Sequence, residues 1–211
     1  MEHVPDQTIN RLPVYLRCLT RARDQGLRVV NSLQLSIMVG TNAAQVRKDL
    51  SYLGELGTRG IGYDVDSLMA QISGVLGLTE KRRVAIVGYG RLGGSLLGYK
   101  GFAERGFDIV GIFDADPAKA GRAADLRGSV ATGLTVRSMD HLEDDLRELG
   151  VDIVILTTPA EVAQEVAERV AAGGVRAILN FAPLRLRLPD DVRVKEVDVS
   201  VDLQVLSFHL G

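Results

Sequence analysis

A glycine-rich turn limits the possible folds of this chain more than any other segment. The turn is Gly88-Tyr89-Gly90-Arg91-Leu92-Gly93; it follows a short apolar strand at 83–87 and opens a helix at 92–101. In this context the spacing G-x-G-x-x-G is typical of a dinucleotide-binding domain. The glycines permit a tight turn, close approach of a pyrophosphate and close helix–strand packing, and the helix amides can hold the phosphates. The alternative is a glycine turn in an α/β domain that binds no dinucleotide.

A carboxylate stands where such a domain meets the adenosine ribose. Asp114 ends the second apolar strand, 21 residues after Gly93. A carboxylate at this position can accept hydrogen bonds from the ribose hydroxyls. It would repel a 2′-phosphate, so the sequence favours NAD(H) over NADP(H), although Arg91 could accept a phosphate. The residues that follow the later strands are candidates for the nicotinamide pocket: Thr157, Thr158, Pro159, Asn180 and Phe181. The alternative is that they form ordinary turns at the strand ends.

Continuous apolar runs alternate with helical stretches after Gly77. The runs lie at 83–87, 108–113, 151–156, 176–179 and 192–197, and the helices are expected at 92–101, 141–149 and 161–172. Apolar runs separated by helices predict a parallel, doubly wound sheet. We expect one weak additional strand within 121–138, and a terminal helix with an apolar stripe at 199–210.

The first 77 residues show helices separated by short glycine turns. Helices are expected at 9–24, at 33–39 capped by Ser32, at 43–53 opened by a capping box of Asn42 and Gln45, and at 66–77. The tight turn at Gly40 gives a helix-turn-helix pattern, and the glycine-rich segment 57–62 is the expected tip of a wing. The predicted organisation is α/β: a winged-helix domain at 1–77, a Rossmann domain at 78–198 and a C-terminal helix at 199–211.

Charge is distributed unevenly between these parts. Residues 11–63 hold eight basic and three acidic residues, a net charge of +5, whereas 64–211 hold 17 basic and 22 acidic residues, a net charge of −5. A basic module on an acidic body is typical of nucleic-acid contact. A solvated helical surface explains the charge equally well.

The helix expected at 43–53 has the surface of a DNA-recognition helix. Steps of about 100° per residue place Ala43, Val46, Leu50 and Leu53 on one apolar side. The opposite side is small, polar and basic, as a helix in the major groove requires. The predicted DNA contacts are Ala44, Gln45, Arg47, Lys48, Ser51 and Tyr52 on this helix, with Arg59 and Gly60 on the wing.

Composition disfavours several other classes of protein. One cysteine, Cys18, and three scattered histidines predict neither an internal disulfide nor a metal site. The chain lacks a long apolar run and a secretory signal pattern, so we expect a cytoplasmic protein without a membrane partner. No histidine follows a strand of the cofactor domain, and no cysteine lies after Gly77. The sequence therefore predicts a cofactor site without a catalytic acid, base or nucleophile.

Two segments have a specific pattern: A-Q-V-R-K-D-L-S-Y-L-G-E-L-G-T-R-G-I-G-Y at 44–63, and the glycine turn followed by L-L-G-Y-K-G-F at 96–102. Both resemble the redox-sensing transcriptional repressor family called Rex. The resemblance implies a homodimer that binds inverted-repeat operator DNA, is released by NADH and binds DNA with NAD+. It also implies a C-terminal helix exchanged between subunits, and places Tyr99 near the cofactor and the subunit interface. Arg91, Leu53 and Leu56 depart from the family pattern, and Arg91 touches the cofactor turn.

We therefore expect a non-enzymatic, NADH-sensing repressor that binds a palindromic operator as a homodimer. One alternative is a small NAD-dependent oxidoreductase, which would need measurable turnover. Another is a CoA- or nucleotide-binding module similar to the cofactor domain of acyl-CoA ligases, which Asp114 disfavours. A third is a regulator that uses the fold only to dimerise. Stabilisation by NADH but not by CoA would separate these possibilities.

Overall fold

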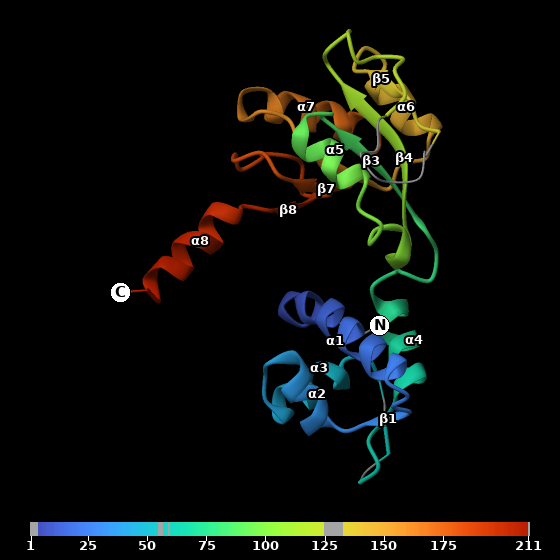
Figure 1. Cartoon of the computed structure of the whole chain (residues 1–211), viewed down its shortest axis with the longest axis vertical. Coiled ribbons are helices and arrows are strands. Elements are labelled where there is room, and N and C mark those ends of the chain that lie inside the picture. The colour runs from blue at the N-terminus through green and yellow to red at the C-terminus, as the bar shows by residue number, and fades with distance from the viewer. Residues whose placement is uncertain (1–3, 55–56, 59, 125–132, 211) are drawn as a thin grey trace. The chain divides into compact units, whose positions relative to one another are not determined.

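The computed structural model describes residues 4–54, 57–58, 60–124 and 133–210. The chain forms two compact units, residues 1–80 and 81–211. Figure 1 shows the helical first unit in blue to teal and the second, built around a sheet, in green to red. In the part that is described, no helix is long and apolar enough to cross a membrane. The same residues include no group of three metal-ligating side chains placed to hold an ion.

The first unit is a helical cluster with a small sheet. Its elements are α1 (Asp6–Asp24), β1 (Val29–Val30), α2 (Ser32–Val39), α3 (Ala43–Ser51), β2 (Tyr63–Asp64) and α4 (Val65–Val75). β1 and β2 pair antiparallel, and β1 was not expected from the sequence. The helices enclose one apolar core, which includes Leu12, Leu19, Leu35, Val46, Leu50, Leu68 and Ile72. This is the winged-helix arrangement that the sequence predicts.

The caps of α2 and α3 explain why the helix-turn-helix forms. The prediction that Ser32 caps α2 was wrong: Asn31 is the cap, and it exchanges hydrogen bonds with Gln34 in a capping box. α2 ends at Gly40, whose φ of 77° is left-handed, as predicted. Asn42 caps α3 by accepting a hydrogen bond from the backbone N–H of Gln45. The predicted capping box is incomplete, because the Gln45 side chain bonds elsewhere.

Glycines shape the predicted wing. Thr58 and Gly62 form an antiparallel bridge at its base, and Gly62 has a φ of 114°. A β-carbon at Gly62 would lie 2.6 Å from the carbonyl oxygen of Val30, so only glycine fits beside β1. Tyr63 and Asp64 continue from the wing into β2, and the Asp64 side chain then caps α4.

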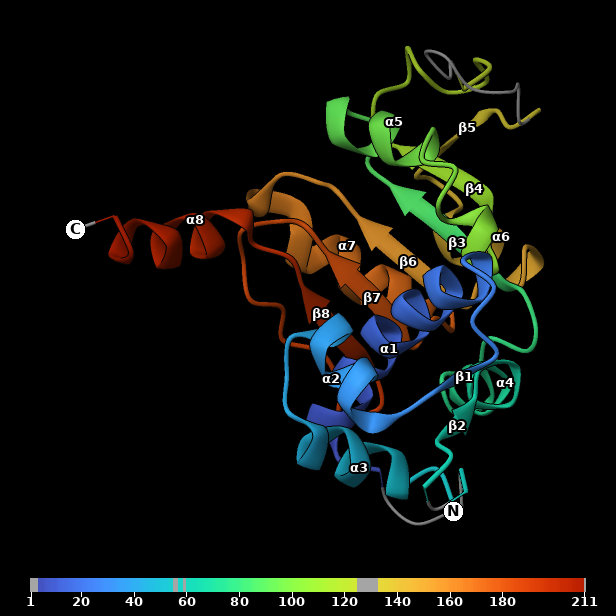
Figure 2. The same ribbon diagram turned by 60° about the horizontal axis from the view of Figure 1, so that its bottom comes forward.

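The second unit has a parallel sheet with helices on both faces. Its elements are β3 (Arg82–Val87), α5 (Arg91–Leu97), the short η1 (Ala103–Arg105), β4 (Phe107–Asp114), β5 (Val136–Ser138), α6 (Leu142–Glu148), β6 (Ile153–Leu156), α7 (Ala160–Ala172), β7 (Ala177–Asn180), β8 (Arg193–Glu196) and α8 (Val199–Phe208). Within the described residues the sheet order is β5-β4-β3-β6-β7-β8, the order of a Rossmann fold. Figure 2 shows these strands fanned in that order. The weak strand expected within 121–138 is β5.

Alternate side chains of the strands face two apolar clusters. Ala85 and Val87 of β3 pack with α6 and α7, whereas Val84 and Ile86 pack on the side of α5. Both faces of the central strand are therefore buried, which explains its continuous apolar run. The prediction that the helix after the glycine turn reaches residue 101 was wrong, because α5 ends at Leu97 and is followed by Gly98.

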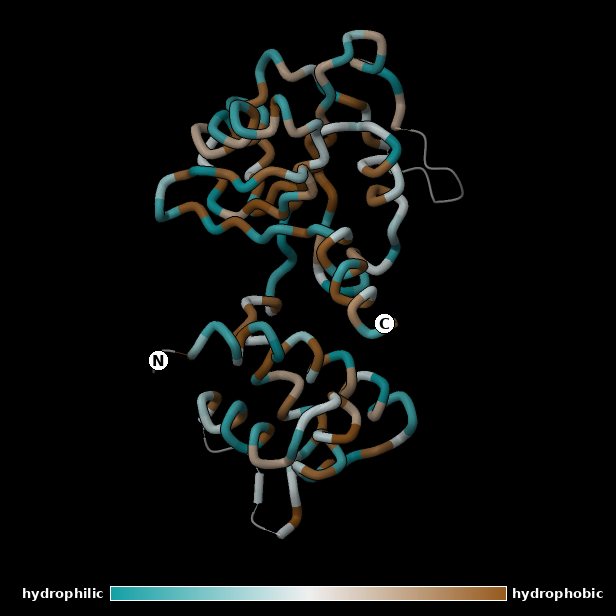
Figure 3. Tube along the Cα trace, turned by 90° about the vertical axis from the view of Figure 1, so that its left-hand side faces the viewer, coloured by the Kyte–Doolittle hydropathy of each residue, from teal (hydrophilic) through white to brown (hydrophobic). Residues whose placement is uncertain are grey.

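The terminal helix α8 buries none of its side chains within the chain. Its exposed apolar residues are Val199, Val201, Leu203, Val205, Leu206 and Phe208. Figure 3 shows these hydrophobic positions in brown along the helix nearest the C-terminal label. Asp198 caps the helix by accepting a hydrogen bond from the Ser200 N–H. An apolar helix of this kind needs a partner surface to bury it.

Candidate dinucleotide site and nucleic-acid interface

The three glycines of the turn after β3 differ in their surroundings. Gly88 has a φ of 102°, and a β-carbon there would lie 2.7 Å from the carbonyl oxygen of Thr157. A β-carbon at Gly93 would collide with the carbonyl oxygen of Gly88, so α5 packs directly on the turn. At Gly90, by contrast, a β-carbon would have no heavy atom of the described chain within 4 Å. The first and third glycines are therefore required by the fold, while the second faces open space that a ligand can enter.

Thr157, at the end of the neighbouring strand, holds this turn in place by hydrogen bonds. It follows β6, and its hydroxyl donates a hydrogen bond of 2.7 Å to the carbonyl oxygen of Gly88. Its backbone N–H donates to the carbonyl oxygen of Val87. The sequence suggested Thr157 for the nicotinamide pocket, whereas its hydroxyl is engaged in holding the glycine turn.

The carboxylate of Asp114 lies against the same turn. One of its oxygens accepts a 2.7 Å hydrogen bond from the backbone N–H of Tyr89, and the other accepts one from the backbone N–H of Asp116. Burial raises the pKa of Asp114, but the hydrogen bonds from Asp116, Lys119 and Tyr89 outweigh it and hold the pKa below its ordinary value. The strand end and the glycine turn therefore meet, with an ionised carboxylate between them.

Lys119 was missed from the sequence. Its ammonium group forms an ion pair with Asp114 at 2.9 Å, and its side chain is about one-third exposed. It follows the carboxylate by five residues, in the loop after β4. A positive charge so close to the ribose position partly offsets the repulsion that Asp114 would exert on a 2′-phosphate.

The residues after β6 and β7 have different roles. The hydroxyl oxygen of Thr158 is buried and has no hydrogen-bond partner in the described chain, which is costly unless a ligand supplies one. Asn180 is fully buried, and its amide nitrogen already donates to the carbonyl oxygens of Ala182 and Leu184. Its amide oxygen accepts from the Ala182 N–H, so this side chain shapes the turn.

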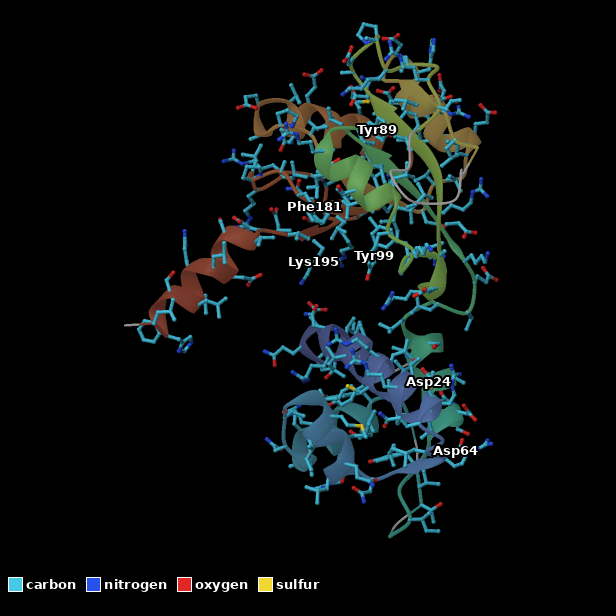
Figure 4. The ribbon with its side chains drawn as sticks, viewed as in Figure 1. Asp24, Asp64, Tyr89, Tyr99, Phe181 and Lys195 are labelled. Atoms are coloured by element: carbon cyan, nitrogen blue, oxygen red, sulfur yellow. The ribbon has the colours of Figure 1, made fainter. Side chains whose placement is uncertain are left out.

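The remaining predicted cofactor residues lie around α5 and the neighbouring strand ends. Figure 4 labels Tyr89 and Tyr99, which lie at opposite ends of α5, and Phe181, which follows β7. Tyr99 is half-exposed and packs edge-on against Phe102, with ring centroids 5.1 Å apart. Arg91 and Leu92 are exposed in the first turn of α5, and Pro159 is exposed at the start of α7.

The first unit exposes the predicted recognition surface of α3. Ala44, Arg47, Lys48 and Ser51 are all exposed, while Val46 and Leu50 of the same helix are buried in the core. The Arg47 guanidinium donates a 3.2 Å hydrogen bond to the hydroxyl of Ser32, at the start of α2. The basic side chains thus lie on one side of α3, as the helical spacing predicted.

The other predicted DNA contacts are distributed differently. Tyr52 is half-buried just after α3, and Gly60 is exposed in the wing with a φ of 84°. Arg59 lies outside the described residues. The Gln45 side chain donates a hydrogen bond to the carboxylate of Asp49, so it points toward the protein interior. Asp49 is a fully buried acid in the middle of α3, and its burial was not expected from the sequence.

Taken together, these two sites define a class of protein. A winged helix with an exposed basic recognition helix is joined to a Rossmann unit whose glycine turn and strand-end carboxylate can hold a dinucleotide. Two family models match in the same places: "Putative DNA-binding protein N-terminus" at residues 3–51 and "CoA binding domain" at residues 79–184.

Relatives of known name cover both units at once. The chain is 48% identical over 206 residues to the redox-sensing transcriptional repressor Rex of Streptomyces avermitilis, covering 98% of this chain and 79% of that protein. It is 41% identical over 209 residues to Rex 1 of Thermotoga maritima, covering 99% and 97%. The chain therefore belongs to the Rex family of redox-sensing transcriptional repressors.

Solved structures agree with this assignment. RSP, a Rex-family repressor, superposes on the whole chain with a TM-score of 0.88 at 33% identity, covering 95% of that protein. The structure of RSP in complex with β-NAD+ and operator DNA gives a TM-score of 0.90, covering 94% of that chain. The structure of RSP with β-NADH gives 0.86, covering 95%.

Proposed function

We propose that this protein is an NADH-sensing transcriptional repressor that binds a palindromic operator when NADH is scarce and is released when NADH binds. The observation that carries the proposal is the coexistence, in one chain, of an exposed basic α3 and a glycine turn open at Gly90 beside an ionised Asp114. The whole-chain similarity to RSP, which has been solved with operator DNA and with both forms of the nucleotide, supports it.

The protein is proposed to act as a homodimer in the cytoplasm, where its DNA and its NADH pool lie. Two recognition helices would then enter successive major grooves about 34 Å apart. The exposed apolar side chains of α8 support exchange of this helix between subunits, with the predicted boundaries of 78–198 for the cofactor domain and 199–211 for the exchanged segment. No catalytic role is assigned to any residue.

The switch requires that NADH bind the DNA-free conformation more tightly than the operator-bound one. Reciprocity then requires operator DNA to weaken NADH binding by the same factor. The test uses a palindromic duplex selected by the wild-type protein from a randomised pool, at one fixed salt concentration. We expect NADH to release the labelled duplex at concentrations at which NAD+ has little effect.

Controls separate this proposal from its rivals. CoA should neither release DNA nor stabilise the protein, because the ionised Asp114 repels a phosphate on the ribose. Nucleotide turnover with a range of carbonyl and alcohol substrates would favour an oxidoreductase. DNA binding that neither NADH nor NAD+ changes would favour a regulator that uses the Rossmann fold only to dimerise.

Asp114→Asn should weaken NADH binding by about tenfold, the effect of losing one charge-assisted hydrogen bond of about 1.5 kcal/mol. The same change should reduce the preference for NADH over NADPH, because Lys119 would then lack its counter-ion. Titration calorimetry with both nucleotides measures the two effects. Because the pKa of Asp114 lies below its ordinary value, the wild-type affinity should stay constant as the pH falls from about 8 to about 5. If Asp114→Asn leaves the affinities for NADH and NADPH unchanged, Asp114 does not contact the nucleotide.

A further inference from the structure

The recognition helix α3 contains a charge that does not face DNA. Asp49 lies between Lys48 and Leu50 and has no exposed surface. Burying a carboxylate is expensive, and pairing it seldom stabilises a fold more than an apolar residue of similar volume would. A charge kept at such a place is therefore better explained by the geometry that it imposes than by the stability that it adds.

The partners of Asp49 come mainly from α1. Arg11 donates from Nε and Nη2 to the two carboxylate oxygens, at 2.6 and 2.7 Å. The hydroxyls of Tyr15 and Thr8 donate at 2.9 and 3.0 Å. These three residues are spaced three and four apart, so they lie on one side of α1. Gln45 of α3 completes the group with a bond of 2.9 Å.

This geometry fixes the rotation of α3 as well as its distance from α1. A two-point bond between a planar guanidinium and a planar carboxylate holds one relative orientation, which apolar contacts do not. A roll of α3 by one residue, about 100°, would break the pair. The same roll would displace Arg47 and Lys48, which are two residues and one residue before Asp49.

The electrostatics agree with the geometry. Burial raises the pKa of Asp49, but the hydrogen bonds from Arg11, Tyr15, Gln45 and Thr8 outweigh it and hold the pKa below its ordinary value. The carboxylate is therefore ionised whenever the winged helix is folded near neutral pH. The two bonds from Arg11 to this carboxylate are therefore charge-assisted.

We propose that Asp49 is a positioning residue for operator recognition: through Arg11 and Tyr15 it fixes the orientation in which α3 presents Arg47 and Lys48 to the bases. The proposal rests on the proposed function, since it concerns DNA binding by this surface. Asp49 itself touches no DNA. Its expected signature is a loss of discrimination between operator and other sequences, with little change in non-specific affinity.

The ratio of operator to non-operator affinity is the appropriate measurement. Partial unfolding lowers both affinities by the same factor, so it cancels in the ratio. The two probes are the duplex selected by the wild-type protein and a scrambled duplex of equal length, measured at one salt concentration. Specific sites are typically bound about 10³–10⁷ times more tightly than non-specific DNA, which leaves ample range to detect a loss.

Arg11→Lys is the first variant, because it keeps the charge and removes the two-point bond. We expect the ratio to fall by about tenfold, the order of one base contact. Arg23→Lys is the matched control, since Arg23 is an exposed residue of the same helix and its replacement should leave the ratio unchanged.

Asp49→Asn is the second variant, and here simple electrostatics predicts the opposite sign. Loss of one negative charge from the basic unit should tighten all DNA binding, as Asp24→Asn should do at the exposed end of α1 (Figure 4). If Asp49 positions α3, the operator affinity should fall while non-specific affinity holds or rises. Should this variant fail to fold, Tyr15→Phe deletes only one donor and should lower the ratio by about threefold.

Three results would overturn the inference. If Arg11→Lys and Tyr15→Phe keep the wild-type ratio of operator to non-operator affinity, the hydrogen bonds to Asp49 do not orient α3 for recognition. An Asp49→Asn protein that binds the operator as Asp24→Asn does would show the same. Equal losses on both duplexes would show that Asp49 serves stability alone. A wild-type protein that selects no palindrome would instead defeat the proposed function, and that outcome is seen before any variant is made.

Discussion

Gly90→Ala should weaken NADH binding by about a hundredfold while leaving the folded structure unchanged. A β-carbon at Gly90 would meet no heavy atom of the described chain within 4 Å, and Gly90 has a φ of −89°, which alanine adopts without strain. The methyl group would instead occupy the space that a pyrophosphate needs above the start of α5. Losing one or two charge-assisted hydrogen bonds of about 1.5–3 kcal/mol accounts for the size of the effect.

Gly93→Ala provides the contrast. Its added methyl would collide with the backbone of Gly88, so we expect destabilisation of about 1–3 kcal/mol in the second unit together with loss of NADH binding. Gly74→Ala, in α4 of the other unit, is the control for a glycine-to-alanine change in open helical surroundings. It should leave NADH affinity unchanged and stabilise α4 by up to about 1 kcal/mol.

Calorimetry of NADH binding and thermal unfolding of each variant separate these effects. A Gly90→Ala protein that binds NADH like the wild type would show that the phosphates do not approach this turn. DNA binding in the absence of NADH should be retained by Gly90→Ala, because the variant lies outside the winged helix. Loss of that binding would mean that the two units are coupled even without nucleotide.

The features predicted correctly from the sequence depend on short stretches of chain. The glycine turn needs a left-handed residue at Gly88 and a close contact at Gly93, and both requirements lie within six residues. The alternation of apolar runs and helices gives a doubly wound sheet because its central strand, β3, is buried on both faces. The position of Asp114 beside the glycine turn could be predicted because it is the last residue of its strand, β4. Local pattern and local geometry agree in these cases, so the prediction was reliable.

The features that the sequence did not predict are of two kinds. Some depend on partners that are distant in the sequence, and others on a choice between neighbouring residues of similar propensity. The donors to Asp49 from α1 lie 34 to 41 residues earlier, so a helical wheel of α3 alone shows only that an acid lies near its apolar side. Thr157 bonds to a residue 69 positions away. Asn31 and Ser32 are both good caps, and composition does not choose between neighbours. Gln45 could bond to its cap or to Asp49, and only the packed structure decides.

Arg47→Ala and Lys48→Ala should each lower operator affinity by about 10- to 100-fold, and the double variant should abolish selective binding at moderate salt. Both side chains are exposed on the side of α3 away from the core, and Ser32 holds the Arg47 guanidinium in place. A bidentate base contact is worth about 1–3 kcal/mol of discrimination, and the loss of a phosphate contact reduces the slope of the salt dependence by about one unit.

The salt dependence tells the two roles apart. A residue that contacts a phosphate should weaken operator and non-operator binding alike and reduce the slope of log affinity against log salt, whereas a residue that reads a base should lower the ratio and leave the slope nearly unchanged. Arg193→Ala, which removes the same charge from exposed β8, is the control and should change neither quantity. NADH affinity should remain at the wild-type value in every variant of α3, because the glycine turn lies in the other unit. Full operator affinity in the double variant would move the recognition surface away from α3 and leave the basic charge of this unit as a solvated surface.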